Sequence, residues 1–182
     1  QVDYFFNDFT VDLWVKPMND GVLLANRQKE YDKGAKGWLL FVENGTLKFR
    51  YSPSNQFNKP TYEPASDEQK TIEGGKLNMG EWAHVAITEK RDGSIRLYVN
   101  GMLTGEGERY RREHTLNNST YLSLFADAFE YAPIEAAVDE LKIWNYELNE
   151  EEIRREMYSV NVDNRNGLVA YYAFNGDNLS GD

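Results

Sequence analysis

The chain has no cysteine, only two histidines and no long apolar run among its 182 residues. Without cysteine it can form neither a disulfide framework nor a thiolate zinc site, and it has no cysteine nucleophile. His84 and His114 have no Asp, Ser or second His at catalytic or metal-ligand spacing, so we expect each to be structural or exposed. No segment approaches the roughly 18 apolar residues of a membrane-spanning helix, and we therefore expect no membrane insertion by this segment.

Positive charge is also scarce, since 20 Lys and Arg stand against 30 Asp and Glu and give a net charge of −10. Such an acidic chain repels phosphate backbones, which disfavours nucleic-acid binding. Aromatic residues are abundant at 14%, and this composition favours strands and excludes disorder.

Three turn dipeptides separate alternating apolar runs: Asn44-Gly45, Asp92-Gly93 and Asn100-Gly101. Asn-Gly and Asp-Gly readily adopt the positive φ angles of two-residue hairpin turns, so each dipeptide predicts antiparallel pairing of its flanking strands. A chain of hairpins argues against the βαβ units that usually carry nucleotide or redox chemistry.

Alternation with a period of two predicts most of the strands. The predicted strands are 10–16, 22–26, 38–43, 46–51, 82–89, 94–99, 121–125, 137–144 and 168–174. Residues 52–78 and 105–119 lose the alternation and are predicted to be loops, the first long enough to be functional.

One short helix is predicted over 149–158, because Asn149 can act as its N-cap and Glu152 stands at the capping-box position. Ile153 and Met157, four residues apart, should face a sheet. The sequence therefore predicts an all-β, two-sheet antiparallel β-sandwich (jelly roll) with one short helix near the C-terminus, in one domain over 1–182.

Five stretches carry a resemblance to a known family. They are FTVDLWVKP at 9–17, GWLLFVENGTLKF at 37–49, WAHVAITEKRDGSIRLYVNG at 82–101, VDELKIWNYELNEEEI at 138–153 and GLVAYYAFNG at 167–176. In this order they resemble the laminin G-like jelly-roll domain of the concanavalin A-like lectin/glucanase superfamily, as in bacterial cell-surface proteins. The resemblance implies a module of a larger extracytoplasmic protein, at the cell surface or secreted, whose export signal is not in this fragment. It does not specify function, because the scaffold carries lectin-like, adhesive, structural and hydrolytic members.

Aromatic side chains in the irregular segments are the candidates for ligand binding, because loops on a rigid sandwich concentrate binding residues. Tyr and Phe rings can stack on the C–H surface of a sugar, and a nearby arginine can bond its hydroxyls. The candidate ligand-binding residues are Phe57, Tyr62, Tyr110, Arg111, Phe129 and Tyr131. The alternative is that these rings only hold their own loops in place. The four tryptophans lie within predicted strands and are assigned to packing: Trp14, Trp38, Trp82 and Trp144.

Asp139 is the most informative carboxylate, because alternation places it with Leu141 and Ile143 on the face that should point into the sandwich. A buried carboxylate must be paired, hydrogen-bonded or metal-bound. Relatives of this fold often hold calcium where such segments meet, and calcium prefers oxygen ligands. The resemblance thus implies a structural Ca²⁺ site at Asp139, Asn175 and Asp177. The alternative is that Asp139 accepts backbone amides and binds no metal.

Glycoside hydrolysis requires two carboxylates about 5–9.5 Å apart on one face. Glu135 and Asp139 share a face but would lie roughly 13.6 Å apart along an extended strand. Ala137 stands where a second carboxylate would be needed, and Glu140 is predicted to point to solvent beside Lys142. We therefore expect no enzyme activity.

The sequence favours a non-catalytic binding module of an extracytoplasmic protein that recognises carbohydrate. The expected partners are a glycan or a cell-surface protein, and other domains of the same polypeptide. Two alternatives stay open: a structural or adhesive spacer that contacts only protein, and a glycoside hydrolase.

Overall fold

The computed structural model of the protein describes residues 7–30, 34–52, 70–108, 120–127, 132–160 and 165–175. These residues form eleven strands and one helix, and the strands make two sheets. Sheet A has the order β11 (Leu168–Tyr172), β10 (Ala136–Trp144), β1 (Phe9–Pro17), β6 (Ala83–Glu89), β7 (Ser94–Val99) and β8 (Met102–Glu108). Sheet B has the order β5 (Lys70–Lys76), β4 (Thr46–Ser52), β3 (Gly34–Glu43), β2 (Gly21–Glu30) and β9 (Ser123–Leu124).

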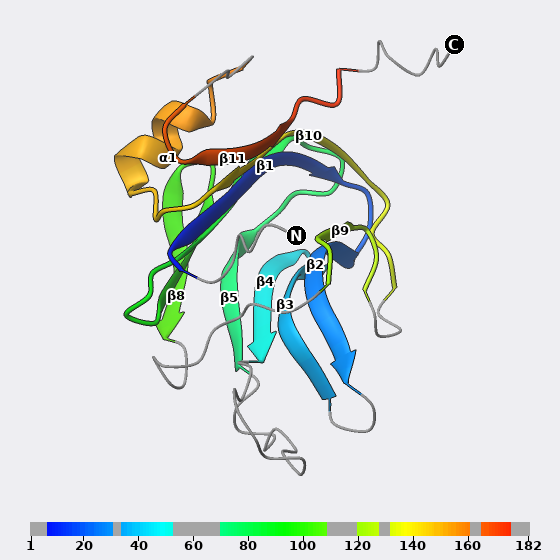
Figure 1. The fold of residues 1–182 in the computed structure, drawn as a ribbon. Coiled ribbons are helices and arrows are strands. Elements are labelled where there is room, and N and C mark those ends of the chain that lie inside the picture. Colours follow the sequence, from blue (N-terminus) through cyan, green and yellow to red (C-terminus); the bar gives the residue numbers. More distant parts are fainter. Residues whose placement is uncertain are drawn as a thin grey trace, which may run out of the picture.

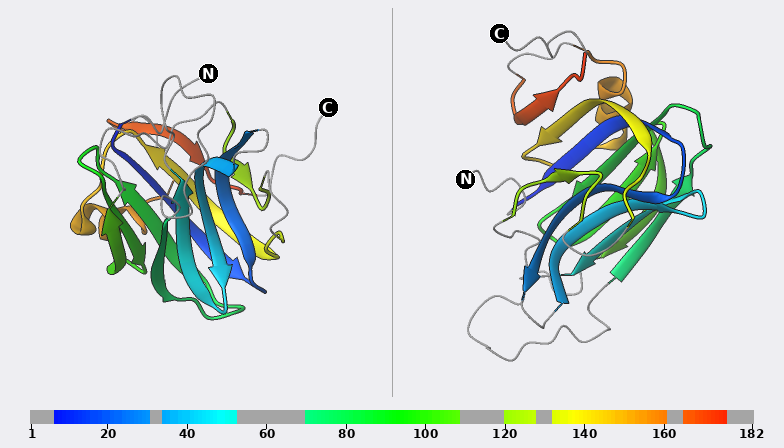
Figure 2. Two further views of the ribbon diagram at one scale, coloured as in Figure 1. Left: turned by 90° about the horizontal axis from the view of Figure 1, so that it is seen from below. Right: turned by 90° about the vertical axis from the view of Figure 1, so that its right-hand side faces the viewer.

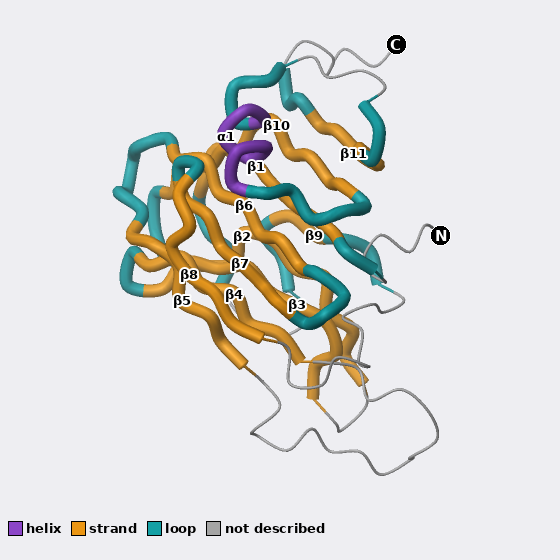
Figure 3. The backbone as a smooth tube through the Cα atoms, turned by 90° about the vertical axis from the view of Figure 1, so that its left-hand side faces the viewer, coloured by secondary structure: helices purple, strands orange, loops and turns teal. Residues whose placement is uncertain are grey.

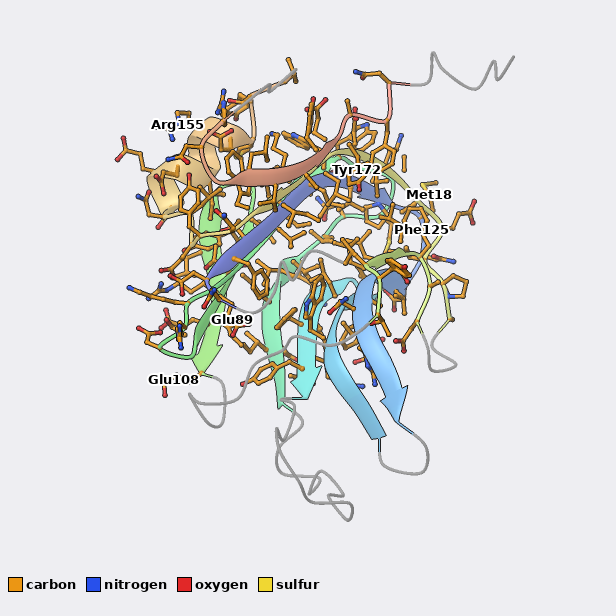
Figure 4. All side chains as sticks on the ribbon, in the orientation of Figure 1. Met18, Glu89, Glu108, Phe125, Arg155 and Tyr172 are labelled. Atoms are coloured by element: carbon orange, nitrogen blue, oxygen red, sulfur yellow. The ribbon has the colours of Figure 1, made fainter. Side chains whose placement is uncertain are left out.

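Neighbouring strands in both sheets pair antiparallel, and the two sheets face each other as separate layers (Figure 1, Figure 2). The predicted all-β, two-sheet architecture with one short helix is confirmed. Inward side chains of alternating strand positions fill the space between the layers (Figure 4). Trp38 lies at the centre of this core, with its ring 6.3 Å from Phe9 and 5.7 Å from Phe49.

Both Asn-Gly turns form as predicted. Asn44 and Gly45 have φ angles of 52° and 68°, and Asn100 and Gly101 have φ angles of 51° and 75°. These values are the two successive left-handed residues of a type I′ hairpin turn. The carboxylate of Asp20 accepts hydrogen bonds from the Asn44 and Gly45 amides at 2.6 and 3.0 Å, which ties the β3–β4 turn to the connection between β1 and β2.

The Asp92-Gly93 hairpin also forms, but not as a two-residue turn. β6 ends at Glu89 and β7 begins at Ser94, so the connection has four residues, and only Gly93 has a positive φ, at 101°. The Lys90 amide donates to the Ser94 carbonyl at 2.9 Å, while the Asp92 carboxylate accepts from the Ser94 amide. Asp92 therefore stabilises the turn through its side chain instead of adopting the left-handed conformation.

Two predicted loops contain strands. β5 occupies part of the region 52–78, and β8 extends the hairpin as far as Glu108. Both strands are rich in glycine, which hides the alternation, and the structure shows why glycine is needed. A Cβ on Gly105 would lie 2.2 Å from the Glu73 carbonyl oxygen, and a Cβ on Gly107 would lie 2.7 Å from the Ile72 side chain. The glycines thus allow the edges of the two sheets to approach each other closely.

Helix α1 (Glu150–Glu156) begins with the predicted capping box. The Asn149 side chain accepts from the Glu152 amide at 2.9 Å, and the Glu152 carboxylate accepts from the Asn149 amide at 2.8 Å. Ile153 packs with Ala86, Tyr98 and Trp144 on the outer face of sheet A, where the helix lies (Figure 3), and Met157 is also buried. Arg155 extends from its exposed side (Figure 4). Across the described ranges no helix is long and apolar enough to span a membrane.

A β-bulge in β10 changes which side chains face the core. β1 pairs Asp12 with Lys142 but then Trp14 with Asp139, so β10 carries one extra residue at this point. Glu140 is the extra residue, and its backbone has a φ of 53°. Because side chains alternate along a strand, one extra residue exchanges the two faces. The prediction that Asp139 points into the sandwich is therefore wrong, and Asp139 lies on the outer face opposite Trp14.

Candidate functional site

An open hollow of about 490 Å³ lies on the outer face of sheet A. Five segments far apart in sequence contribute to it: β1, the turn before β6, the β10 bulge, the segment after α1 and the segment after β11. We call it the outer-face hollow, and its described lining residues are Trp14, Trp82, Asp139, Glu140, Val160 and Asn175.

The two tryptophans form an aromatic wall. Trp82 is 47% exposed, and Val160, which also lines the hollow, is 60% exposed. Trp14 is half-buried and held in place, because its Nε1 donates to the Met157 carbonyl at 2.9 Å and its ring packs edge-on against His84 at 5.5 Å. Trp14 is thus the fixed part of the aromatic wall, and Trp82 is the part that a ligand can reach.

The assignment of Trp82 to packing was wrong, whereas Trp38 and Trp144 are fully buried as expected. A signal for this was present in the sequence. Trp82 shares its strand face with His84 and not with Val85 and Ile87, and the polar partner marks the face that lies outside the core.

The other polar lining residues, Asp139, Glu140 and Asn175, bring side-chain oxygen atoms to the hollow. Asp139 Oδ1 accepts from the Glu140 backbone amide at 2.9 Å, and Glu140 Oε2 accepts from the Tyr171 hydroxyl at 2.6 Å. Glu140 is largely buried, so the prediction that it points to solvent was wrong. Asn175 is exposed and lines the same hollow as Asp139. Asp177, the third residue of the predicted calcium site, lies outside the described residues.

Lys142 holds the segment that carries Val160. Its side chain is buried, and Nζ donates to the carbonyl oxygens of Glu156 and Ser159, each at 2.8 Å. The prediction that Lys142 lies in solvent was therefore wrong. A cation at the C-terminal end of a helix is favoured by the exposed carbonyls there. The lysine thereby fixes the position at which the chain leaves α1 and reaches the hollow.

A buried polar cluster lies beneath the aromatic wall. Asp12 Oδ1 is 3.1 Å from His84 Nε2, and Asp12 Oδ2 accepts from Trp144 Nε1 at 2.8 Å. Because a carboxylate only accepts, the His84 Nε2 donates to it. His84 is structural, as predicted, and it supports the ring of Trp14. His114 lies outside the described residues.

The described oxygen ligands alone are too few for calcium. Ca²⁺ takes six to eight oxygen atoms, whereas the hollow offers two carboxylates and one carboxamide, and one oxygen of each carboxylate already accepts a hydrogen bond. Within the described ranges no group of three or more His, Cys, Asp or Glu side chains is arranged to hold a metal ion. Glu135, which was predicted to share a strand face with Asp139, lies just before β10, is exposed and is not among the lining residues.

The predicted ligand-binding residues fall in segments outside the described ranges. They are Phe57, Tyr62, Tyr110, Arg111, Phe129 and Tyr131. The outer-face hollow is therefore a second candidate site, formed in part by two tryptophans that were expected to serve packing alone.

Two antiparallel sheets packed face to face, with one capped helix on the outer face, define a jelly-roll sandwich. Residues 2–154 match the concanavalin A-like lectin/glucanases superfamily, and the chain belongs to this family. No curated protein matches the chain.

Solved structures share the fold at low sequence identity. A candidate carbohydrate-binding protein from Bacteroides ovatus aligns with a TM-score of 0.67 and 16% identity over 95% of this chain and 47% of that one. The receptor-binding domain of a botulinum neurotoxin C/D mosaic serotype aligns with a TM-score of 0.60 and 17% identity, over 84% of this chain and 36% of that one. A heptameric pentraxin from Limulus polyphemus aligns with a TM-score of 0.58 and 18% identity, over 85% of this chain and 71% of that one. The chain thus spans less than half of the first two structures, and the likeness shows the fold alone.

Proposed function

We propose that the chain is a non-catalytic binding module of an extracytoplasmic protein and that the outer-face hollow binds a carbohydrate. One observation carries the proposal: an accessible indole, Trp82, shares a hollow with the oxygen-bearing side chains of Asp139 and Asn175. An indole face packs against the C–H surface of a sugar ring, and carboxylate and carboxamide oxygens accept hydrogen bonds from its hydroxyls. Mostly apolar walls with a few placed polar groups are typical of small-ligand sites.

The comparisons are compatible with this proposal. The superfamily includes lectins, and a protein of the same fold from Bacteroides ovatus is described as a candidate carbohydrate-binding protein. The loop residues Phe57, Tyr62, Tyr110, Arg111, Phe129 and Tyr131 stay proposed as further ligand contacts. A glycan or a glycosylated cell-surface protein is the proposed partner.

A structural calcium ion is proposed from the family resemblance. Asp139, Asn175 and Asp177 would be among its ligands, and the remaining oxygen atoms would have to come from water, backbone or residues outside the described ranges. Its proposed role is to hold the segment after β11 against β10.

A glycan array with the wild-type chain and the variant Trp82→Ala tests the proposal. We expect binding to a defined set of glycans, weakened at least about tenfold by Trp82→Ala, because exposed tryptophans commonly dominate binding energy. Tyr121→Ala is the matched control, since Tyr121 is 85% exposed and does not line the hollow. Absence of binding to any glycan would contradict the proposal and favour a structural or adhesive domain. Equal binding by Trp82→Ala would place the site elsewhere.

The proposal that the chain has no catalytic activity requires a separate measurement. Incubation with β-glucans followed by detection of new reducing ends should show no turnover. Measurable turnover would contradict it.

A further inference from the structure

The charge of the outer-face hollow restricts its ligands, on the assumption that the proposed function is correct. Two lining residues, Asp139 and Glu140, are carboxylates, and none of the described lining residues is Lys, Arg or His. Neither carboxylate takes part in an ion pair within the described part of the chain. Their hydrogen-bond donors, a backbone amide and the Tyr171 hydroxyl, are neutral. The charges of both groups therefore act on whatever enters the hollow.

The cations of the surrounding described elements form no ion pair with Asp139 or Glu140. Lys142 donates to two backbone carbonyls beneath the end of α1. Lys16 is the next outward residue after Trp14 on β1, but it does not line the hollow. Glu81, which precedes Trp82 and is exposed, adds a further negative charge close to the aromatic wall.

We infer that the outer-face hollow, when Asp139 holds no calcium ion, selects glycans that are neutral or carry a free amino group and rejects glycans that carry a carboxylate. An anionic sugar would lose its hydration next to two like charges, which raises the free energy of the complex. A sugar ammonium group would be attracted by Asp139 and could lie over the exposed face of Trp82 as a cation–π pair. The expected order of affinity is amino sugar, then neutral sugar, then acidic sugar.

Matched ligands isolate the charge from the shape. Lactose is compared with sialyllactose, and an N-acetylated chitin oligomer with its deacetylated form, by calorimetry in the presence of a calcium chelator at low and at high salt. They are measured alongside a charge-stratified glycan array. We expect the deacetylated oligomer to bind about tenfold more tightly than the acetylated one at low salt, and the difference to shrink at high salt. Acidic members should bind about tenfold more weakly than their neutral partners.

Asp139→Asn tests the residue assignment, because the amide keeps the shape and an oxygen acceptor for the Glu140 amide. It should remove most of the preference for the amino form and improve the relative binding of the acidic form. Glu106→Gln makes the same charge change on β8, at the far edge of sheet A, and should leave both ratios unchanged.

The outcomes separate the two proposals. If acidic glycans bind as tightly as neutral ones while Trp82→Ala still abolishes binding, the charge selection is refuted and carbohydrate binding stands. An unchanged ratio in Asp139→Asn likewise refutes the charge selection. If no array member binds, the proposed function fails and the selection fails with it.

Discussion

Asp12→Ala should strongly destabilise the protein, because the Asp12 carboxylate satisfies two donors inside a fully buried cluster. The substitution leaves the His84 Nε2 donor and the Trp144 Nε1 donor without an acceptor in a place that solvent does not reach. Each buried donor left unpaired costs about 1–3 kcal/mol, so the free energy of unfolding should fall by about 4 kcal/mol. For a chain of this length the melting temperature should fall by about 10 °C. Urea denaturation followed by tryptophan fluorescence, with calorimetry for the melting temperature, measures both.

Two variants show whether this reasoning is correct. Asp12→Asn keeps one acceptor and the size of the side chain, so we expect about half the loss. Glu151→Ala, on the exposed face of α1, should change stability by no more than about 0.5 kcal/mol. A loss below about 1 kcal/mol for Asp12→Ala would refute the argument that these two bonds stabilise the outer face.

Three further predictions follow from other features. Gly105→Ala should reduce the free energy of unfolding by about 2 kcal/mol, because its Cβ would overlap the Glu73 carbonyl; wild-type stability in urea would show that the strand edges are not so close. Burial raises the pKa of Tyr98 and Tyr146 above 10.0, so the unfolded chain ionises first. The contribution of these two tyrosines to stability is complete below pH 10 and is lost as pH rises through their raised pKa values. Tyr98→Phe should therefore reduce the decrease in melting temperature that is measured as pH is raised above 10. Calcium at saturating concentration should raise the melting temperature and a chelator should reverse this; an unchanged midpoint would contradict the proposed ion.

Local features were predicted well because their causes lie within a few residues. The Asn44-Gly45 turn needs two left-handed residues, and the sequence supplies the two residue types that adopt this conformation most readily. The helix start needs an acceptor and an acidic residue three positions later, and Asn149 and Glu152 provide both.

The candidate site could not be predicted in the same way, because it depends on pairing between distant strands. Asp139 was assigned to the wrong face because alternation was counted without the extra residue at Glu140. Nothing within β10 itself marks this position, since a bulge is defined by the strand opposite it. β5 was not predicted, and the end of β8 from residue 105 on was predicted to be a loop, for another reason. The glycines of both strands serve the contact between the sheets, and in the sequence they are typical of loops.

The extra residue in β10 means that chain length, and not only residue identity, brings two adjacent carboxylates, Asp139 and Glu140, to the outer-face hollow. Removing Glu140 would restore an unbroken alternation with Val138 and Leu141 facing the core and Asp139 still facing outward, so the hollow would keep one carboxylate instead of two. Among relatives, a single-residue deletion here would therefore leave the Asp139 carboxylate in place and remove only the second one. Counting the residues between the two core-facing positions of β10 that flank the bulge is therefore a sharper guide to a shared site than matching carboxylates in an alignment.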